Sequence, residues 1–164
     1  TKAEISYLMS IYEHWIDTDL KTAMKEQIRI IHLGRKDRIP KTLRKKLEET
    51  ELKTKKFTKY YLGIALDYGG RDELLRMAQK IRNSKFEIRN EGEMNKFLDT
   101  KDFPHPNPDL IIRTSGEFRT SGFLPWQGAY SEYIFSKKYL PDFTVKDLKQ
   151  AIEEYRSRQR RFGK

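Results

Sequence analysis

Four short apolar segments alternate along the chain with longer segments that have the spacing of amphipathic helices. The short segments are rich in Ile, Leu, Tyr and Phe, and they span residues 27–33, 60–66, 109–113 and 130–135. Runs of this length and composition favour buried β-strands. Strands that alternate with helices are typical of a mostly parallel sheet with helices on both faces, where ligands bind at the carboxyl ends of the strands. The sequence therefore predicts an α/β fold of this kind.

The helical segments are predicted from the spacing of apolar residues and from the residues at their ends. Pro40 is well placed to open one helix, because its missing N–H group is not needed in a first helical turn. Thr144 is expected to cap another. The expected helices span residues 3–24, 40–57, a segment after residue 70, 91–98 and 145–161. With no internal repeat and no clear linker, we expect one domain over residues 1–164.

Length and composition exclude several classes of protein. The 164 residues carry 34 Lys and Arg against 24 Asp and Glu, a formal net charge of +10, and 12% are aromatic, which argues against a disordered tail. Without cysteine, disulfides, thiolate metal sites and thiol nucleophiles are excluded. The sequence has no run of the roughly 18 to 20 apolar residues that a membrane span needs. Four acidic residues lie among the first twenty, where a secretory signal would have an apolar stretch. We therefore expect a cytoplasmic protein.

Charged and hydroxyl-bearing residues that could bind a ligand are concentrated in residues 113–132, RTSGEFRTSGFLPWQGAYSE. This segment begins where a strand is predicted to end. Arg113 and Arg119 flank a glycine-containing loop, and a guanidinium group donates two parallel hydrogen bonds to phosphate oxygens. Hydroxyl groups and free backbone N–H groups of the loop can converge on the same anion. The hydroxyl-bearing residues are Thr114, Ser115, Thr120 and Ser121. The segment therefore predicts a site for phosphate or diphosphate.

Two carboxylates belong to the same segment. Glu117 can orient one of the arginines. Glu132 is a candidate Mg²⁺ ligand, because Mg²⁺ takes one or two protein carboxylates together with phosphate oxygens and water. One carboxylate alone would form a weak site. An arginine at a strand end beside a glutamate is more often a structural ion pair, and this alternative stays open.

Other features have simpler structural interpretations. Phe123, Trp126 and Tyr130 are expected to fill the core or an interface, and the three histidines are too scattered to indicate a metal pair or a general base. The DYGG turn at residues 67–70 lacks the spacing of a phosphate-binding glycine loop and is expected to be a strand-to-helix turn. The lysine-rich segment at residues 41–59 is expected to be a solvated face, although such a segment can also attract a polyanion.

The run DLIIRTSGEFRTSGFLPWQGAYSEYIF, residues 109–135, closely resembles the carboxyl-terminal signature of the cis-prenyltransferases, the undecaprenyl and dehydrodolichyl diphosphate synthases. The resemblance extends to YGGRDEL at residues 68–74, to LPDF and to RRFG at residues 160–163. It implies that isopentenyl diphosphate units are condensed onto farnesyl or geranylgeranyl diphosphate with cis double bonds, giving a long polyprenyl diphosphate lipid carrier. It also implies a homodimer that uses Mg²⁺ and no redox cofactor.

The resemblance implies roles residue by residue. Arg113, Arg119 and Ser121 resemble the catalytic residues that hold isopentenyl diphosphate. Thr120 lies between the latter two and belongs to the same substrate-binding set. Glu132 resembles the carboxylate that helps to place Mg²⁺.

The two ends of the chain carry a further match and a departure. Arg161 and Gly163 resemble the terminal substrate-binding element that reaches across the dimer to the neighbouring active site. The family's amino-terminal strand and its Asp-Gly-Asn type motif, whose aspartate binds the allylic diphosphate and metal, do not precede Thr1. We therefore expect the chain to represent the last two thirds of a synthase and to be inactive alone. A smaller departure is Gly122, where Asn often follows the serine.

Two alternative functions stay open. A non-catalytic partner subunit of a prenyltransferase is one, but it would not need to keep Arg113, Arg119, Ser121 and Glu132. A basic nucleic-acid-binding domain is the other, but the sequence has no zinc, RNP-type or KH-type signature, so we expect no nucleic-acid partner. As an enzyme, the cationic protein would attract diphosphates and the anionic membrane that receives its lipid product. Peripheral membrane contact is therefore expected.

Overall fold

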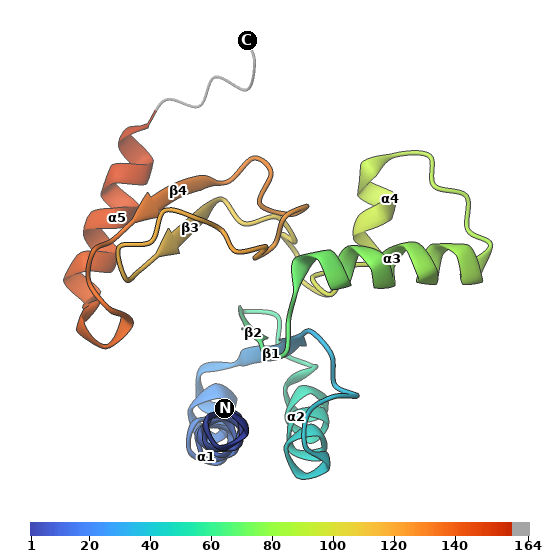
Figure 1. Ribbon diagram of the computed structural model, residues 1–164, viewed down its shortest axis with the longest axis horizontal. Coiled ribbons are helices and arrows are strands. Elements are labelled where there is room, and N and C mark those ends of the chain that lie inside the picture. The colour runs from blue at the N-terminus through green and yellow to red at the C-terminus, as the bar shows by residue number, and fades with distance from the viewer. Residues whose placement is uncertain (159–164) are drawn as a thin grey trace. The chain divides into compact units, whose positions relative to one another are not determined.

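The computed structural model describes residues 1–158 and divides into two compact units, Thr1–Pro104 (unit 1) and a second that begins at His105 (unit 2). Each unit contains one pair of parallel strands together with helices (Figure 1). These parallel pairs and helices confirm the predicted α/β class. The four strands found in the described residues are the four that the sequence predicts, and they form two pairs.

The observed elements lie close to the expected ranges. Unit 1 contains α1 Lys2–Glu26, β1 Ile28–Leu33, α2 Lys41–Thr54, β2 Tyr60–Ala65, α3 Gly70–Ser84 and α4 Glu91–Asn95. Unit 2 contains β3 Leu110–Arg113, β4 Glu132–Phe135, the 3-10 turn η1 Leu140–Asp142 and α5 Val145–Ser157. Pro40 has an extended ψ of 141° and serves as the N-cap of α2, so it precedes the first helical turn that it was expected to open.

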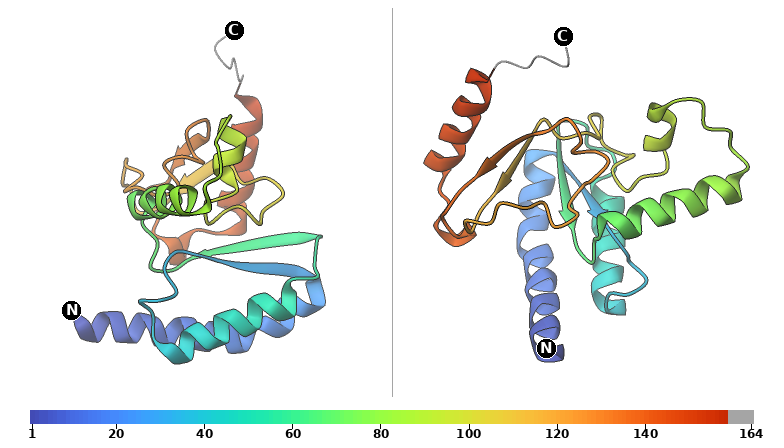
Figure 2. Two further views of the ribbon diagram at one scale, coloured as in Figure 1. Left: turned by 90° about the vertical axis from the view of Figure 1, so that its right-hand side faces the viewer. Right: turned by 45° about the horizontal axis from the view of Figure 1, so that its top comes forward.

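Unit 1 is built on a β1–α2–β2 crossover. The strands pair in register from Ile28 beside Tyr60 to Leu33 beside Ala65. Helices α1 and α2 lie side by side against this pair (Figure 2, left). The apolar residues buried between them form the core of the unit, and they are Ile16, Ile39, Leu43, Leu47 and Leu66. The spacing of four between the two leucines of α2 places both on the face of the helix that turns inward.

Side chains close the edge of β1 that does not pair with β2. The backbone N–H of Ile30 donates to Thr54 Oγ1 at 3.1 Å, and that of His32 donates to Glu51 Oε1 at 2.8 Å. Just beyond the strand, the N–H of Gly34 donates to Asp99 Oδ2 at 3.0 Å. Because N–H groups of alternate residues point to the same edge of a strand, these three bonds satisfy donors that a neighbouring strand would otherwise take.

The turns around the strand ends explain two of the glycine-containing motifs. Gly34 has φ of +123°, and a Cβ there would lie 2.4 Å from the carbonyl oxygen of Leu66, so only glycine fits. In the DYGG segment Gly69 is the N-cap of α3, which confirms the expected strand-to-helix turn. Asp67 of this turn accepts two hydrogen bonds from the Arg38 guanidinium, both at 2.7 Å.

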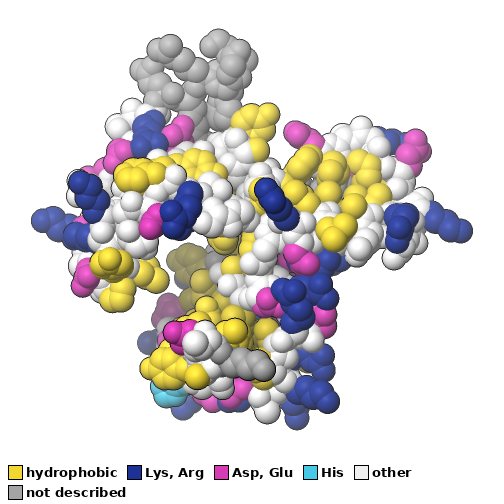
Figure 3. All heavy atoms as spheres, in the orientation of Figure 1, with side chains coloured by type: hydrophobic (Ala, Val, Ile, Leu, Met, Phe, Trp, Pro, Cys, Tyr) yellow, Lys and Arg dark blue, Asp and Glu magenta, His cyan; other side chains and the backbone are white. Residues whose placement is uncertain are grey.

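The lysine-rich helix α2 has the solvated face that the sequence predicts. Leu43 and Leu47 turn inward, whereas Lys46 reaches Asp17 of α1 at 2.6 Å and Lys53 lies 3.9 Å from Glu49. Basic and acidic side chains are intermingled on this part of unit 1 (Figure 3). Among residues 1–158, no helix combines the length and the apolar content that a membrane crossing requires.

Unit 2 places the polar loop between its two strands. β3 and β4 pair in register from Leu110 beside Glu132 to Arg113 beside Phe135, and residues 114–131 connect them. Thr144 caps α5 as predicted, and the backbone N–H of Thr144 donates in return to Asp147 Oδ2 at 2.8 Å. Hydrogen bonds from Lys138 and Thr144 hold the pKa of Asp147 well below its usual value.

Candidate diphosphate-binding site

Arg113 organises the loop that follows β3. Its Nη1 donates to the backbone carbonyl of Arg119 at 2.5 Å and to Ser121 Oγ at 3.1 Å. The loop therefore curls back around the guanidinium at the carboxyl end of the strand. Three of the predicted site residues, Arg113, Arg119 and Ser121, are brought together by these two bonds.

The first turn of the loop is anchored to the chain after β4. Ser115 and Gly116 both have positive φ, 72° and 71°. Their N–H groups donate to the carbonyls of Lys138 and Ser136, at 2.7 and 2.9 Å. The expectation that free N–H groups of this loop converge on an anion is therefore wrong for these two residues, because both donors are already used. They hold the loop in place, so neither of these two N–H groups is available to an anion.

The second turn explains a departure from the family pattern. Ser121 and Gly122 have φ of 50° and 74°, in the left-handed region. A Cβ at Gly122 would meet no atom within 4 Å. Glycine and asparagine are the residues that adopt this backbone conformation most readily, so either fits here. The turn is closed by a bond of 2.9 Å from the N–H of Phe123 to the carbonyl of Thr120.

A cavity of about 220 Å³ opens beside this loop. Arg113, Arg119, Thr114 and Thr120 supply its polar lining. The rest of the lining is formed by Ile111, Ile112, Phe123, Tyr133 and Phe135. Cationic donors together with aromatic and aliphatic side chains suit a ligand with an anionic head and a hydrocarbon tail.

Two aromatic predictions can be compared with this arrangement. The ring of Phe123 lines the cavity, so its surroundings are not those of a core residue. The side chain of Tyr130 is 81% exposed and fills no core in the described structure. The rings of Tyr133 and Phe135, which the sequence analysis did not single out, stack with centroids 6.1 Å apart and form one wall.

Glu117 pairs with Arg119, as the sequence suggested that it can. The two side chains are 40% and 62% exposed. An ion pair at this exposure contributes little to stability, because water screens it. The Arg119 guanidinium is therefore held near the cavity without being committed to its partner, and a phosphate group can compete for it.

Glu132 lies apart from the arginines. Glu132 pairs with Leu110, whereas Arg113 pairs with Phe135. Glu132 and Phe135 are three residues apart, which is about 10 Å along the strand. Side chains alternate between the faces of a sheet, so this odd spacing puts Glu132 and Arg113 on opposite faces. On its own face Glu132 accepts a hydrogen bond of 2.8 Å from Arg158, and Glu132 and Glu154 raise the pKa of Arg158. Glu132 as it lies here forms an ion pair with Arg158, which follows α5 and is not the strand-end arginine of the open alternative.

The residues described do not fit a magnesium site by themselves. Nowhere in residues 1–158 do three or more His, Cys, Asp or Glu side chains gather as metal ligands. Glu132 would offer one carboxylate, and its Oε2 atom already accepts a hydrogen bond from Arg158. Arg161 and Gly163 lie outside the described residues.

A family model described as undecaprenyl diphosphate synthase matches residues 1–163. The chain belongs to this family of cis-prenyltransferases. An isoprenyl transferase of Thermotoga maritima is 44% identical over 99% of this chain and 70% of the relative. A tritrans,polycis-undecaprenyl-diphosphate synthase (geranylgeranyl-diphosphate specific) of Methanocaldococcus jannaschii is 37% identical over 99% of this chain and 61% of the relative.

The fold also matches a solved structure of the family. Lavandulyl diphosphate synthase from Lavandula x intermedia, crystallised with dimethylallyl diphosphate, superposes with a TM-score of 0.93 and 32% identity. The match covers 100% of this chain and 73% of that protein. The sequence resemblance to cis-prenyltransferases is thus confirmed by the family model, by relatives and by the fold.

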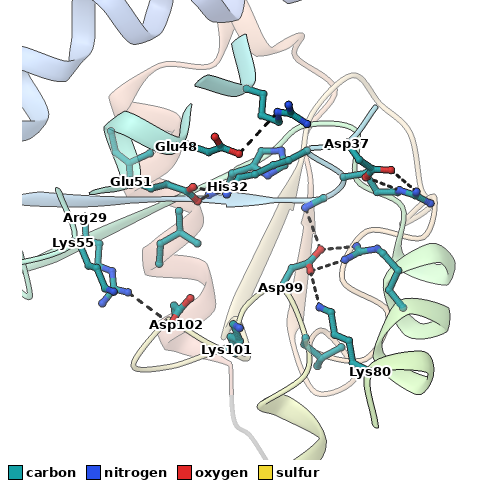
Figure 4. A pocket seen from close by; sticks show the side chains of 18 residues that line it. Arg29, His32, Asp37, Glu48, Glu51, Lys55, Lys80, Asp99, Lys101 and Asp102 are labelled. Carbon is teal, nitrogen blue, oxygen red and sulfur yellow. Dashed lines mark hydrogen bonds and ion pairs between the residues drawn. The ribbon is translucent and has the colours of Figure 1, made fainter. Parts of the chain in front are cut away.

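Within this cis-prenyltransferase, a larger cavity of about 800 Å³ lies in unit 1 and contains none of the predicted site residues (Figure 4). Its carboxylates are already engaged. Asp99 accepts from both terminal nitrogens of Arg76, at 2.8 and 2.6 Å, and from Gly34, while Glu51 accepts from His32 and Lys36. The lining still carries eight Lys and Arg against five Asp and Glu, and its hydrogen bonds and ion pairs tie β1, α2 and α3 together.

Sequence reasoning missed Arg158, the partner of Glu132. It lies within the helix that the sequence predicts over residues 145–161, with no role assigned to it. The spacing of four between Glu154 and Arg158 was an available signal, since such pairs meet on one face of a helix. The contact with Glu132 is long-range, and no local pattern predicts it.

Proposed function

We propose that the loop from Arg113 to Ser121 binds the diphosphate of isopentenyl diphosphate during cis-prenyl chain elongation. The proposal rests on one observation: Arg113, Arg119 and Thr120 line the same cavity as five apolar and aromatic residues, and Arg113 donates a hydrogen bond to Ser121. Two guanidinium groups can hold a diphosphate in a fixed orientation. The apolar walls suit the five-carbon isopentenyl group.

The proposed reaction forms one carbon–carbon bond. The terminal alkene carbon of isopentenyl diphosphate attacks C1 of the allylic diphosphate, the C1–O bond breaks, and diphosphate leaves with the electron pair. A proton is then lost from the isopentenyl unit to give the new double bond. In this scheme Arg113, Arg119 and Ser121 hold the attacking substrate, which lowers the barrier by fixing its orientation.

The allylic partner is proposed from the relatives. The Lavandula protein was crystallised with dimethylallyl diphosphate, and the Methanocaldococcus relative is named as specific for geranylgeranyl diphosphate. We infer that this protein likewise takes an allylic diphosphate, farnesyl or geranylgeranyl diphosphate, and makes a long polyprenyl diphosphate.

Further parts of the proposal rest on the family resemblance. Residues 1–164 would act as one domain, which is supported by one family model matching residues 1–163. Arg161 and Gly163 would reach the diphosphates of the neighbouring subunit in a homodimer. Glu132 would help to place Mg²⁺, although we assign no step to a metal, because the described residues do not form a site. The enzyme would work in the cytoplasm and deliver its lipid at a membrane surface.

Replacement of Arg119 with alanine in the complete synthase tests the proposed site. Arg119 is exposed and its only ion pair in the described structure is with Glu117, so the substitution is expected to leave the fold intact. We expect a higher KM for isopentenyl diphosphate and an unchanged KM for the allylic primer. Glu117→Ala is the matched control, because it removes the same ion pair without removing the guanidinium. Unchanged kinetics in Arg119→Ala would remove this residue from the mechanism.

A further inference from the structure

The end of α2, the start of β2 and the turn between them carry exposed lysines together with exposed apolar side chains. Residues 52–60, LKTKKFTKY, contain four lysines and no acidic residue. All four lysines are exposed. Leu52 and Tyr60 are 74% and 52% exposed, so large apolar side chains reach solvent within the same nine residues. We call these nine residues the 52–60 patch.

The backbone beneath the patch is held firmly. Thr54 is fully buried, donates its hydroxyl to the carbonyl of Thr50 at 2.8 Å, and accepts from the N–H of Ile30. The N–H of Phe57 donates to the carbonyl of Thr54 at 3.0 Å. The patch thus presents its lysines and apolar groups from a turn that is fastened to the core of unit 1.

The positive charge of the patch is not neutralised. Lys56 and Lys59 form no ion pair within residues 1–158, and the pair between Lys53 and Glu49 is long at 3.9 Å. The Lys56 ammonium lies 5.6 Å from the ring centroid of Phe57, and that of Lys59 lies 4.9 Å from the ring of Tyr60. Each of these two ammonium groups therefore lies beside an aromatic ring of the same segment.

We propose that the 52–60 patch docks on the surface of an anionic phospholipid bilayer. Lysine side chains reach headgroup phosphates, while leucine and tyrosine side chains enter the boundary between headgroups and acyl chains. A nucleic acid fits less well, because it offers nothing to the exposed Leu52, and a lysine already covers one face of each aromatic ring that could stack on a base. The proposal does not depend on the diphosphate site, which lies in unit 2.

Vesicle flotation with a charge-matched pair of variants tests this proposal. The patch variant is Lys53→Gln/Lys56→Gln/Lys59→Gln. The control is Lys85→Gln/Lys146→Gln/Lys149→Gln, which also removes three charges at exposed lysines without ion pairs in the described structure. The vesicles are phosphatidylcholine alone or with about one third phosphatidylserine. Lys55 is left unchanged because it lines the unit 1 cavity.

We expect wild type and control to float with the anionic vesicles and not with the neutral ones. A lysine near such a surface contributes about 1 kcal/mol, so three substitutions should weaken partition about a hundred-fold. Equal losses in the two triple variants would mean that net charge alone attracts the protein, and would overturn the proposal. So would an absence of vesicle binding in wild type.

A second variant reports directly on insertion. In Leu52→Trp the new indole should shift its fluorescence to the blue with anionic vesicles and not with a single-stranded oligonucleotide. Oligonucleotide binding that is lost only in the patch variant, without vesicle binding, would assign the patch to nucleic acid instead. Prenyl transfer from soluble short substrates in detergent should be unchanged in the patch variant, so failure of membrane docking and failure of the proposed function give different results.

Discussion

Arg113 gives the sharpest prediction about the site, because its guanidinium both faces the cavity and holds the loop. Its Nη1 bonds the carbonyl of Arg119 at 2.5 Å and Ser121 Oγ at 3.1 Å. A hydrogen bond from a charged donor contributes about 1.5 to 3 kcal/mol, and the lower value applies to this half-buried side chain. Loss of both bonds then costs this loop conformation about 3 kcal/mol. Because only this conformation presents the proposed site, kcat/KM for isopentenyl diphosphate should fall by up to roughly a hundred-fold.

The assay is steady-state prenyl transfer by the complete synthase, with isopentenyl diphosphate varied at saturating primer. Arg113→Ala should lose about a hundred-fold in kcat/KM, and Arg113→Lys about ten-fold, because an ammonium group cannot reproduce the planar fork. The double variant Arg113→Ala/Ser121→Ala should lose less than the two single losses combined, since the residues share a bond. Wild-type kinetics in Arg113→Lys, or additive losses in the double variant, would refute the reasoning.

Two predictions concern stability, both measured by urea unfolding. Burial lowers the pKa of His32 below 6.5. The unfolded state therefore binds a proton more readily than the folded state, and the free energy of unfolding should fall as pH drops from about 7 to about 5. His32→Gln should make this dependence on pH weaker. An equal slope in both proteins would contradict this. Thr54→Val leaves the N–H of Ile30 without its acceptor and should cost about 1 to 3 kcal/mol. Thr54→Ser keeps the hydroxyl and should lose less; equal losses would exclude the hydrogen bond as the cause.

Local patterns were sufficient to predict the elements of this fold. The apolar period of α1, the cap at Thr144 and the glycine turn before α3 each depend on residues within a few positions of one another. The closed edge of β1 was not predictable in the same way. It depends on Thr54, Glu51 and Asp99, which lie 24, 19 and 65 residues from the N–H groups they accept from.

In the candidate site, too, the contacts between residues close in sequence were predictable and the long-range contacts were not. Arg113 and Ser121 are eight residues apart, so a single tight loop is enough to join them, and the sequence predicts their meeting. The occupied N–H groups of Ser115 and Gly116 depend instead on the chain after β4. Their carbonyl partners at residues 136 and 138 belong to a different turn, and a glycine-containing loop looks the same in sequence whether its donors are free or used.

The register of β3 and β4 determines on which face of the strand pair the Glu132 carboxylate lies. The sequence places it in the same twenty-residue run as Arg113, which suggests one site. The register sets Leu110 beside Glu132 and Arg113 beside Phe135, an odd spacing that sends the two charged side chains to opposite faces. A shift of one residue in this pairing would move Glu132 to the face of Arg113, because every side chain of a slipped strand changes face. The alternation within β4 opposes that shift, since it keeps the stacked Tyr133 and Phe135 rings at the cavity wall. The apolar residues of the strand therefore determine where its carboxylate lies.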